Sequence, residues 1–136
     1  MIVADSNVIA YCWLKTPMTS VAQQVRTADP DWHVPLLWRS ELRSALAGYL
    51  RAGQLSGAHV RQRMREVERE LHGSEHLVSS DAVIRVVEAS GLSAYDAEFV
   101  ALAEELGVVL VTEDKMVLKT FPSLAVSMER FLGHGQ

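Results

Sequence analysis

The chain has 136 residues, of which 49% are hydrophobic and 22% are charged, and its formal net charge is −4. This profile is typical of one ordinary globular domain and argues against a generally basic nucleic-acid-binding protein. Cys12 is the single cysteine, so no intramolecular disulfide is possible. No apolar segment reaches the roughly 20 residues that cross a bilayer, so we expect a cytoplasmic protein with no membrane anchor.

The first half of the chain is expected to begin with a short apolar strand at 2–4 and a helix that Pro17 ends. A second helix follows at 19–28 and a short strand at 32–35. Two longer amphipathic helices come next, at 36–53 and 56–73, and each ends at a glycine.

The second half starts with a weak strand at 76–78, followed by helices at 80–89 and 93–107. The clearest strand is the β-branched run at 108–112. A short helix and a last strand within 124–128 complete the pattern. Short apolar strands that alternate with amphipathic helices predict a three-layer α/β/α sandwich around a mostly parallel sheet. We expect one domain over 1–132 and a flexible tail at 133–136.

Charge is unevenly distributed along the chain. The segment 39–69 contains seven arginines and three glutamates, a net charge of +4, which leaves −8 for the remainder. Arginine suits bidentate contacts with phosphate groups. The segment is therefore a candidate polyanion-binding surface, and a pair of solvated helix faces is the alternative.

Four carboxylates share one topological property. Asp5 follows the first strand and Asp114 follows the 108–112 strand, while Glu41 and Asp96 lie in the first turns of their helices. In a parallel α/β sheet, strand carboxyl ends and helix amino ends lie along one edge, where ligands bind. Glu41 and Asp96 each fall about 80° from the centre of their helix's apolar stripe, at the border between core and solvent. For Asp96 that stripe contains Tyr95, Phe99, Leu102 and Leu106.

Each acid also has a purely structural interpretation. Asp5 or Ser6 would cap the first helix, and Asp114 would cap the short helix that directly follows Asp114. Asp96 would complete a capping box with Ser93. Glu41 would pair with a neighbouring arginine, Arg39 or Arg43, or oppose the dipole of its helix.

A metal interpretation follows from charge repulsion. Two carboxylates 4 Å apart repel by about 4 kcal/mol at an effective dielectric of 20, so a cluster needs protons, bases or a cation. Oxygen ligands favour Mg²⁺ or Mn²⁺. The five histidines, at 33, 59, 72, 76 and 134, show no zinc-ligand spacing, and surface or structural roles are expected for them.

Three stretches, DSNVIAYCW, LLWRSELRSALAGYLRAGQLS and GLSAYDAEFVALAEELGVVLVTEDKMV, occur in an order and spacing that resemble PIN-domain proteins. The resemblance is to the VapC-type ribonuclease toxins and extends over residues 2–130. It implies Mg²⁺- or Mn²⁺-dependent endonucleolytic cleavage of RNA in the cytoplasm, a homodimer, and a cognate VapB-like antitoxin.

By position, the resemblance implies that Asp5, Asp96 and Asp114 bind the metal and that Glu41 completes the catalytic set. Ser6, Asn7 and Thr112 are supporting residues. Some family members have a further acid within the next few residues, but residues 115–118 contain none, so the number of metal ions, one or two, stays open and Glu41 would either bind a second ion or orient the attacking water. Glu113 has no assigned role. The candidate RNA-binding residues are Arg39, Arg43, Arg61 and Arg65.

Two alternatives from other classes remain. The first is a PIN-like module that binds RNA or a protein partner without catalysis. The second is an Asp-based phosphatase. The phosphatase of the haloacid-dehalogenase type requires a second aspartate two residues after Asp5, where this chain has Asn7.

Overall fold

The computed structural model describes residues 1–133. At its centre is a five-stranded sheet in the order β3-β2-β1-β4-β5, in which every neighbouring pair is parallel. The strands are β1 (Ile2–Ala4), β2 (Trp32–Pro35), β3 (Glu75–His76), β4 (Leu110–Val111) and β5 (Ala125–Val126). The predicted parallel sheet is confirmed. Of the predicted tail, residues 134–136 lie outside the described part of the chain.

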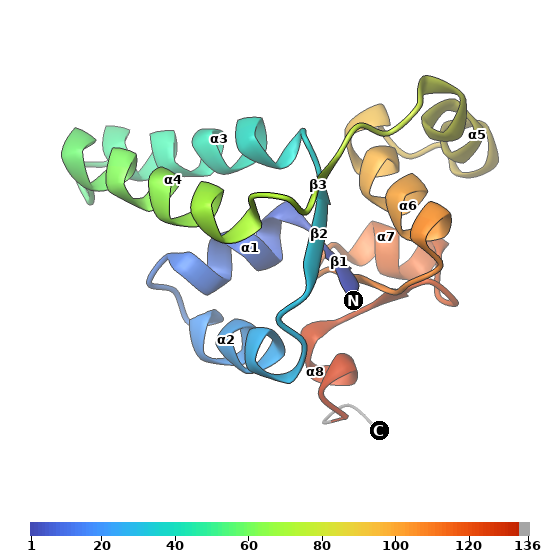
Figure 1. The fold of residues 1–136 in the computed structure, drawn as a ribbon, viewed down its shortest axis with the longest axis horizontal. Coiled ribbons are helices and arrows are strands. Elements are labelled where there is room, and N and C mark those ends of the chain that lie inside the picture. Colours follow the sequence, from blue (N-terminus) through green and yellow to red (C-terminus); the bar gives the residue numbers. More distant parts are fainter. Residues whose placement is uncertain (134–136) are drawn as a thin grey trace.

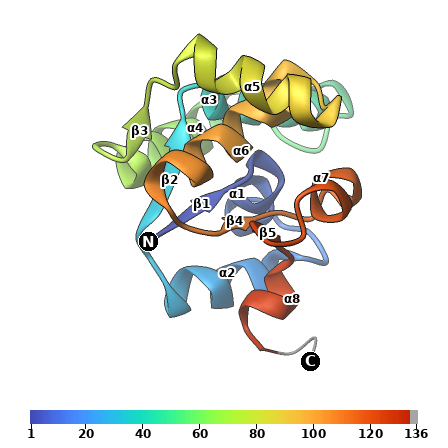
Figure 2. The same ribbon diagram turned by 90° about the vertical axis from the view of Figure 1, so that its right-hand side faces the viewer.

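Helices cover both faces of the sheet and produce the predicted three layers (Figure 1). On one side lie α1 (Ser6–Trp13), α2 (Thr19–Ala28), α3 (Trp38–Arg51) and α4 (Gly57–Leu71). On the other side lie α5 (Ser80–Ser90) and α6 (Ala94–Leu106), in front of the sheet in Figure 2. Two short helices, α7 (Lys115–Thr120) and α8 (Met128–Phe131), flank β5 in sequence. Across residues 1–133, no helix is both long enough and apolar enough to cross a membrane.

The strand β4 is shorter than the run 108–112 from which it was predicted. Only Leu110 and Val111 pair with both neighbouring strands, and both are fully buried. The helix α8 was not predicted, because its four residues are too few for a periodic pattern. Ser127 caps α8 by accepting a hydrogen bond from the backbone N–H of Arg130.

Helix α6 packs between the sheet and α5, so most of its surface is apolar. Ala97 and the run from Phe99 to Ala103 are all buried. One expectation was wrong here: Tyr95, assigned to the buried stripe, is 64% exposed. The buried residues of α6 begin at Ala97, so the part of the helix that packs in the core lies C-terminal to Tyr95.

The strand order creates a switch point between β1 and β4. From β1 the chain builds outward through β2 to β3, then returns to place β4 on the other side of β1. Ligands of open α/β sheets bind at such a point, outside the carboxyl ends of the strands. Ala4 is in register with Val111, so the residues that follow them, Asp5 and Thr112, leave the sheet side by side.

Candidate functional site

Asp5 and Thr112 are in contact at the switch point. The Thr112 hydroxyl donates a hydrogen bond of 2.6 Å to Asp5 Oδ2, and this bond is buried. Thr112 Oγ1 in turn accepts the backbone N–H of Asp114 at 3.0 Å. The two strand ends are therefore locked together by one polar chain that runs from β1 to the start of α7.

The carboxylate of Asp5 is both a helix cap and an unfavourably buried charge. Its Oδ1 accepts the N–H of Ser6 at 2.8 Å, so Asp5, and not Ser6, is the N-cap of α1. Burial raises the pKa of Asp5 to about 6, against the lowering effect of the bonds from Thr112 and Ser6. The negative charges of Glu41 and Asp96 push the pKa in the same direction as burial.

Glu41, in the first turn of α3, faces α1. Its Oε1 accepts a short hydrogen bond from the Ser6 hydroxyl. Burial and, more weakly, the charge of Asp96 raise its pKa. Within residues 1–133 no basic side chain forms an ion pair with Glu41, so the expected pairing with Arg39 or Arg43 is absent. The other structural alternative, an acid that opposes the helix dipole, fits its position in the first turn of α3.

Asp96 and Asp114 begin α6 and α7. Ser93 caps α6: its hydroxyl oxygen accepts the backbone N–H of Asp96. This is the hydrogen bond that the capping-box interpretation predicts. Burial raises the pKa of Asp96, and the charge of Asp114 raises it further. Asp114 Oδ1 caps α7 by accepting the N–H groups of Met116 and Val117. Asp5 at the start of α1 and Asp114 at the start of α7 are therefore each both a helix cap and a candidate metal ligand.

The four predicted acids lie in one region at the carboxyl edge of the sheet, near enough for the charge of one to raise the pKa of another. Asp5 is coupled to Glu41 and Asp96, and Asp96 is coupled to Asp114. Glu98, which the sequence reasoning missed, joins the group: burial and the charge of Glu41 raise its pKa. The available signal was its helical phase, three residues after Tyr95 on the same face of α6.

Side chains from α3 and α6 also line a hollow beside Glu41. It has a volume of about 380 Å³ and is lined by Leu37, Ser40, Glu41, Ser44, Ala45 and Tyr95. The exposed Tyr95 ring therefore lies next to the candidate site, one residue before Asp96. Sequence reasoning missed this role because it assigned Tyr95 to the core.

The two remaining polar residues near Asp5 and Asp114 have structural partners. The side-chain oxygen of Asn7 lies 3.4 Å from the backbone N of Glu113, at the long end of a hydrogen bond. Glu113 itself accepts the N–H of Met128 at 2.9 Å and so anchors the start of α8. Glu113 thus joins the end of β4 to α8.

The grouped acids have the ligand chemistry that a hard divalent cation prefers, because all of them are carboxylates. Within the described residues none is neutralised by an ion pair with a basic side chain. The group consists of Asp5, Glu41, Asp96, Glu98 and Asp114. The set is not tight, however. Across residues 1–133 no three acidic, histidine or cysteine side chains are close enough to form a complete ligand cluster. Such a spread suits Mg²⁺, which keeps several waters and takes only one or two carboxylates directly.

The predicted arginines differ in their surroundings. The Arg39 guanidinium binds Glu68 and Glu75 and lies 5.7 Å from the centre of the Trp38 ring. By contrast, Arg43, Arg61 and Arg65 are exposed and form no ion pair with any residue in 1–133. They lie on α3 and α4, which run side by side away from the sheet (Figure 1).

Known proteins with a similar sequence or fold indicate the family of this chain. The family model described as "PIN domain" matches residues 2–121. The chain is 30% identical to Ribonuclease VapC3 of Mycobacterium tuberculosis over 122 residues, which are 90% of this chain and 88% of that protein. Among solved structures it is similar to PAE2754 from Pyrobaculum aerophilum, with TM-score 0.76, 22% identity, and 97% and 93% of the two chains covered. A toxin–antitoxin complex from Klebsiella pneumoniae contains a similar chain, with TM-score 0.68, 19% identity, and 94% and 98% covered.

Proposed function

Because this chain belongs to the PIN-domain family, and within it to the VapC-type ribonucleases, we propose that it is a Mg²⁺- or Mn²⁺-dependent endoribonuclease and the toxin of a type II toxin–antitoxin pair. One observation carries the proposal. The charges of Glu41 and Asp96 add to the effect of burial on Asp5, whose pKa is raised to about 6, and within residues 1–133 Asp5 forms no ion pair with a basic group. A site that concentrates unneutralised negative charge is suited to a divalent cation.

In this proposal Asp5, Asp96 and Asp114 hold the cation, directly or through water. When bound, the cation supplies Lewis acidity and charge neutralisation for phosphodiester hydrolysis. Thr112 orients Asp5 through the 2.6 Å hydrogen bond, and Ser6 orients Glu41. Glu41 is then positioned to accept a proton from the attacking water, a role that its raised pKa favours.

The substrate proposed is RNA, held by its phosphates. Arg43, Arg61 and Arg65 are the candidate contacts, since each is exposed and unpaired within the described residues. Arg39 is engaged with Glu68 and Glu75 and is better suited to holding α3 to α4 and β3. Binding through phosphates positions the RNA but does not by itself select a sequence.

A VapB-like antitoxin and a second copy of the chain are the proposed protein partners. Support for the antitoxin comes from the family and from the similar chain in the toxin–antitoxin complex of Klebsiella pneumoniae. Copurification of the chain with the product of an adjacent gene, followed by mass measurement of the complex, tests both partners at once.

The decisive experiment measures cleavage of total RNA by the purified protein with Mg²⁺, with Mn²⁺ and with a chelator. We expect cleavage only with the cations, and products with 5′-phosphate and 3′-hydroxyl ends. Asp5→Asn and Asp96→Asn are expected to lower the rate by about 100-fold or more, the scale of losing one charge-stabilising group. Glu104→Gln, an exposed acid farther along α6, is the matched control and should retain activity.

Two results would count against the proposal. Cleavage that persists in the chelator would contradict the proposed metal dependence. Full activity in both aspartate variants would contradict the proposed catalytic site. If the wild-type protein binds RNA but cleaves none under any metal condition, the non-catalytic PIN-like module is the better description.

A further inference from the structure

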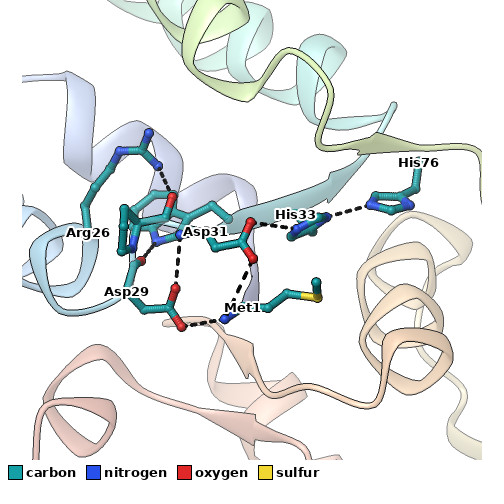
Figure 3. Close-up of polar contacts among 8 residues, drawn as sticks. Met1, Arg26, Asp29, Asp31, His33 and His76 are labelled. Carbon is teal, nitrogen blue, oxygen red and sulfur yellow. Dashed lines mark hydrogen bonds and ion pairs between the residues drawn. The ribbon is translucent and has the colours of Figure 1, made fainter.

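Two histidines that lie 43 positions apart in sequence meet across β2 and β3. His33 Nδ1 is 2.8 Å from His76 Nε2, so the two rings present their nitrogens to each other (Figure 3). The ring centroids are 5.0 Å apart. The register explains the meeting: His76 pairs with Pro35, which lies on the same face of β2 as His33.

A carboxylate fixes the orientation of the first ring. His33 Nε2 is 2.9 Å from Asp31 Oδ1, so in the neutral ring the proton is on Nε2, which donates a hydrogen bond to the carboxylate. The lone pair of His33 is therefore on Nδ1, directed at His76 (Figure 3). A carboxylate that accepts a hydrogen bond from one nitrogen of an imidazole, and so leaves the lone pair on the other nitrogen, is the arrangement found around metal-ligating histidines.

We propose that His33 and His76 form a binding site for a divalent transition metal of the Zn²⁺ class, separate from the carboxylates around Asp5. Imidazole nitrogen is a preferred ligand for such ions, whereas Mg²⁺ prefers oxygen. The ion replaces the hydrogen bond between the rings: His33 Nδ1 and His76 Nε2 coordinate it, and His76 carries its proton on Nδ1.

The spacing of the rings matches that of a tetrahedral metal centre. With metal–nitrogen bonds of about 2.0–2.1 Å, two coordinating imidazoles have centroids roughly 5 Å apart, as these two have. The two nitrogens now point at each other along the line between the centroids. To bind one tetrahedral ion they would separate to roughly 3.3 Å, and each ring would turn by roughly 35° so that both lone pairs meet at the ion.

The surroundings suit a bound cation. His33 has 13% of its side chain exposed, so the site is partly shielded. Glu105, in the last turn of α6, is near enough to raise the pKa of His76, although burial and His33 lower that pKa overall. Within residues 1–133 no third side chain lies at ligand distance, so water completes the coordination. A bound ion would fasten the two-residue edge strand β3 to β2.

Zinc titration of the full chain tests the site, with excess Mg²⁺ present to occupy the carboxylates. We expect one Zn²⁺ per chain, with affinity at least about 10-fold weaker in His33→Gln and in His76→Gln. Asp31→Asn should weaken binding by about 10-fold, the lower end of the effect of an outer hydrogen-bond partner. His59→Gln, an exposed histidine on α4, is the matched control and should bind as the wild type does.

A second readout does not depend on variants that fold. In the wild-type protein, Zn²⁺ should shift the ring-nitrogen NMR resonances of His33 Nδ1 and His76 Nε2 and leave those of His59 unchanged. The proposal is overturned if these resonances do not move at saturating Zn²⁺, or if the two histidine variants bind Zn²⁺ as tightly as His59→Gln. Either outcome would leave a hydrogen-bonded pair with a purely structural role.

Discussion

Asp5 combines two demands on a single carboxylate. One oxygen caps α1 and the other accepts the Thr112 hydroxyl, so the side chain is held rigidly. The same position at the carboxyl end of β1 leaves it only 8% exposed, and burial of a charge is unfavourable. If Asp5 binds the metal as proposed, its burial is a compromise between stability and activity.

The cost of this compromise is measurable in the metal-free protein. A pKa raised from 3.8 to about 6 means that the folded state binds more protons than the unfolded state between these pH values. Stability from this group therefore falls as pH rises through that interval and is constant above it, with a full loss of about 3 kcal/mol. In a chelator, Asp5→Asn should thus be more stable than wild type at pH 8 and equal to it below pH about 4.

Denaturant unfolding across the pH range measures that difference. Glu75→Gln provides a control of opposite sign, because the hydrogen bond and charge of Arg39 lower the pKa of Glu75. Glu75 contributes stability above its unfolded pKa that is lost as pH falls, so Glu75→Gln should be destabilised at pH 7 and unaffected in acid. A pH-independent effect of Asp5→Asn would contradict the raised pKa.

At the scale of elements, the acids gather because strand ends and helix starts coincide. A carboxylate at a helix start accepts free backbone N–H groups and opposes the helix dipole, so it is favourable there for structural reasons. In this chain α1 and α7 begin with such carboxylates, and Glu41 and Asp96 lie in the first turns of α3 and α6. Local helix chemistry therefore favours all four acids at the edge where the candidate site lies.

Helix α7 allows the two roles of Asp114 to be separated. Asp114→Asn retains an oxygen that can accept the Met116 and Val117 N–H groups, whereas Asp114→Ala does not. We expect the alanine variant to lose about 1 kcal/mol of stability and the asparagine variant to lose much less. If Asp114 binds the metal, both variants should lose cleavage activity. Asparagine activity equal to wild type would assign Asp114 to capping alone, and unfolding with parallel RNA-cleavage assays distinguishes these cases.

At the scale of the whole molecule, the candidate acids and the candidate RNA-binding arginines belong to different parts of the fold. The carboxylates gather at the carboxyl edge of the sheet, and the exposed Arg43, Arg61 and Arg65 lie on the pair formed by α3 and α4 (Figure 1). A phosphate backbone drawn to the arginines would be repelled by the acidic edge unless a cation were present there. If the chain binds RNA and a cation as proposed, each would favour binding of the other.

This arrangement predicts the salt dependence of RNA binding. Replacing Arg43, Arg61 and Arg65 with glutamine should reduce the slope of log affinity against log salt by up to about 2, at about 0.7 for each phosphate contact on a single strand. Affinity should fall for all RNA sequences alike. Arg85→Gln with Arg130→Gln, exposed on α5 and α8, is the control. Equal slopes for both variants would exclude α3 and α4 as the RNA-binding surface, as measured by fluorescence anisotropy in Mg²⁺-free buffer.

The order of helices and strands and the edge at which Asp5, Glu41, Asp96 and Asp114 gather were readable from the sequence. Both depend on local signals: apolar periodicity, glycines that end helices, and acids beside strand ends and helix starts. Short elements were less readable. Helix α8 and the true length of β4 are set by tertiary pairing, because such short runs carry too little periodicity.

Contacts between distant side chains were decided only by the tertiary structure. The Thr112–Asp5 bond joins residues 107 positions apart and depends on the register of β4 against β1. The engagement of Arg39 by Glu75, and the meeting of His33 with His76, depend in the same way on how β3 pairs with β2. Sequence spacing carries no information on such pairs, since crossover connections and strand register bring them together. The sequence alone therefore determined which residue types face the sheet's edge, and packing decided which of them touch.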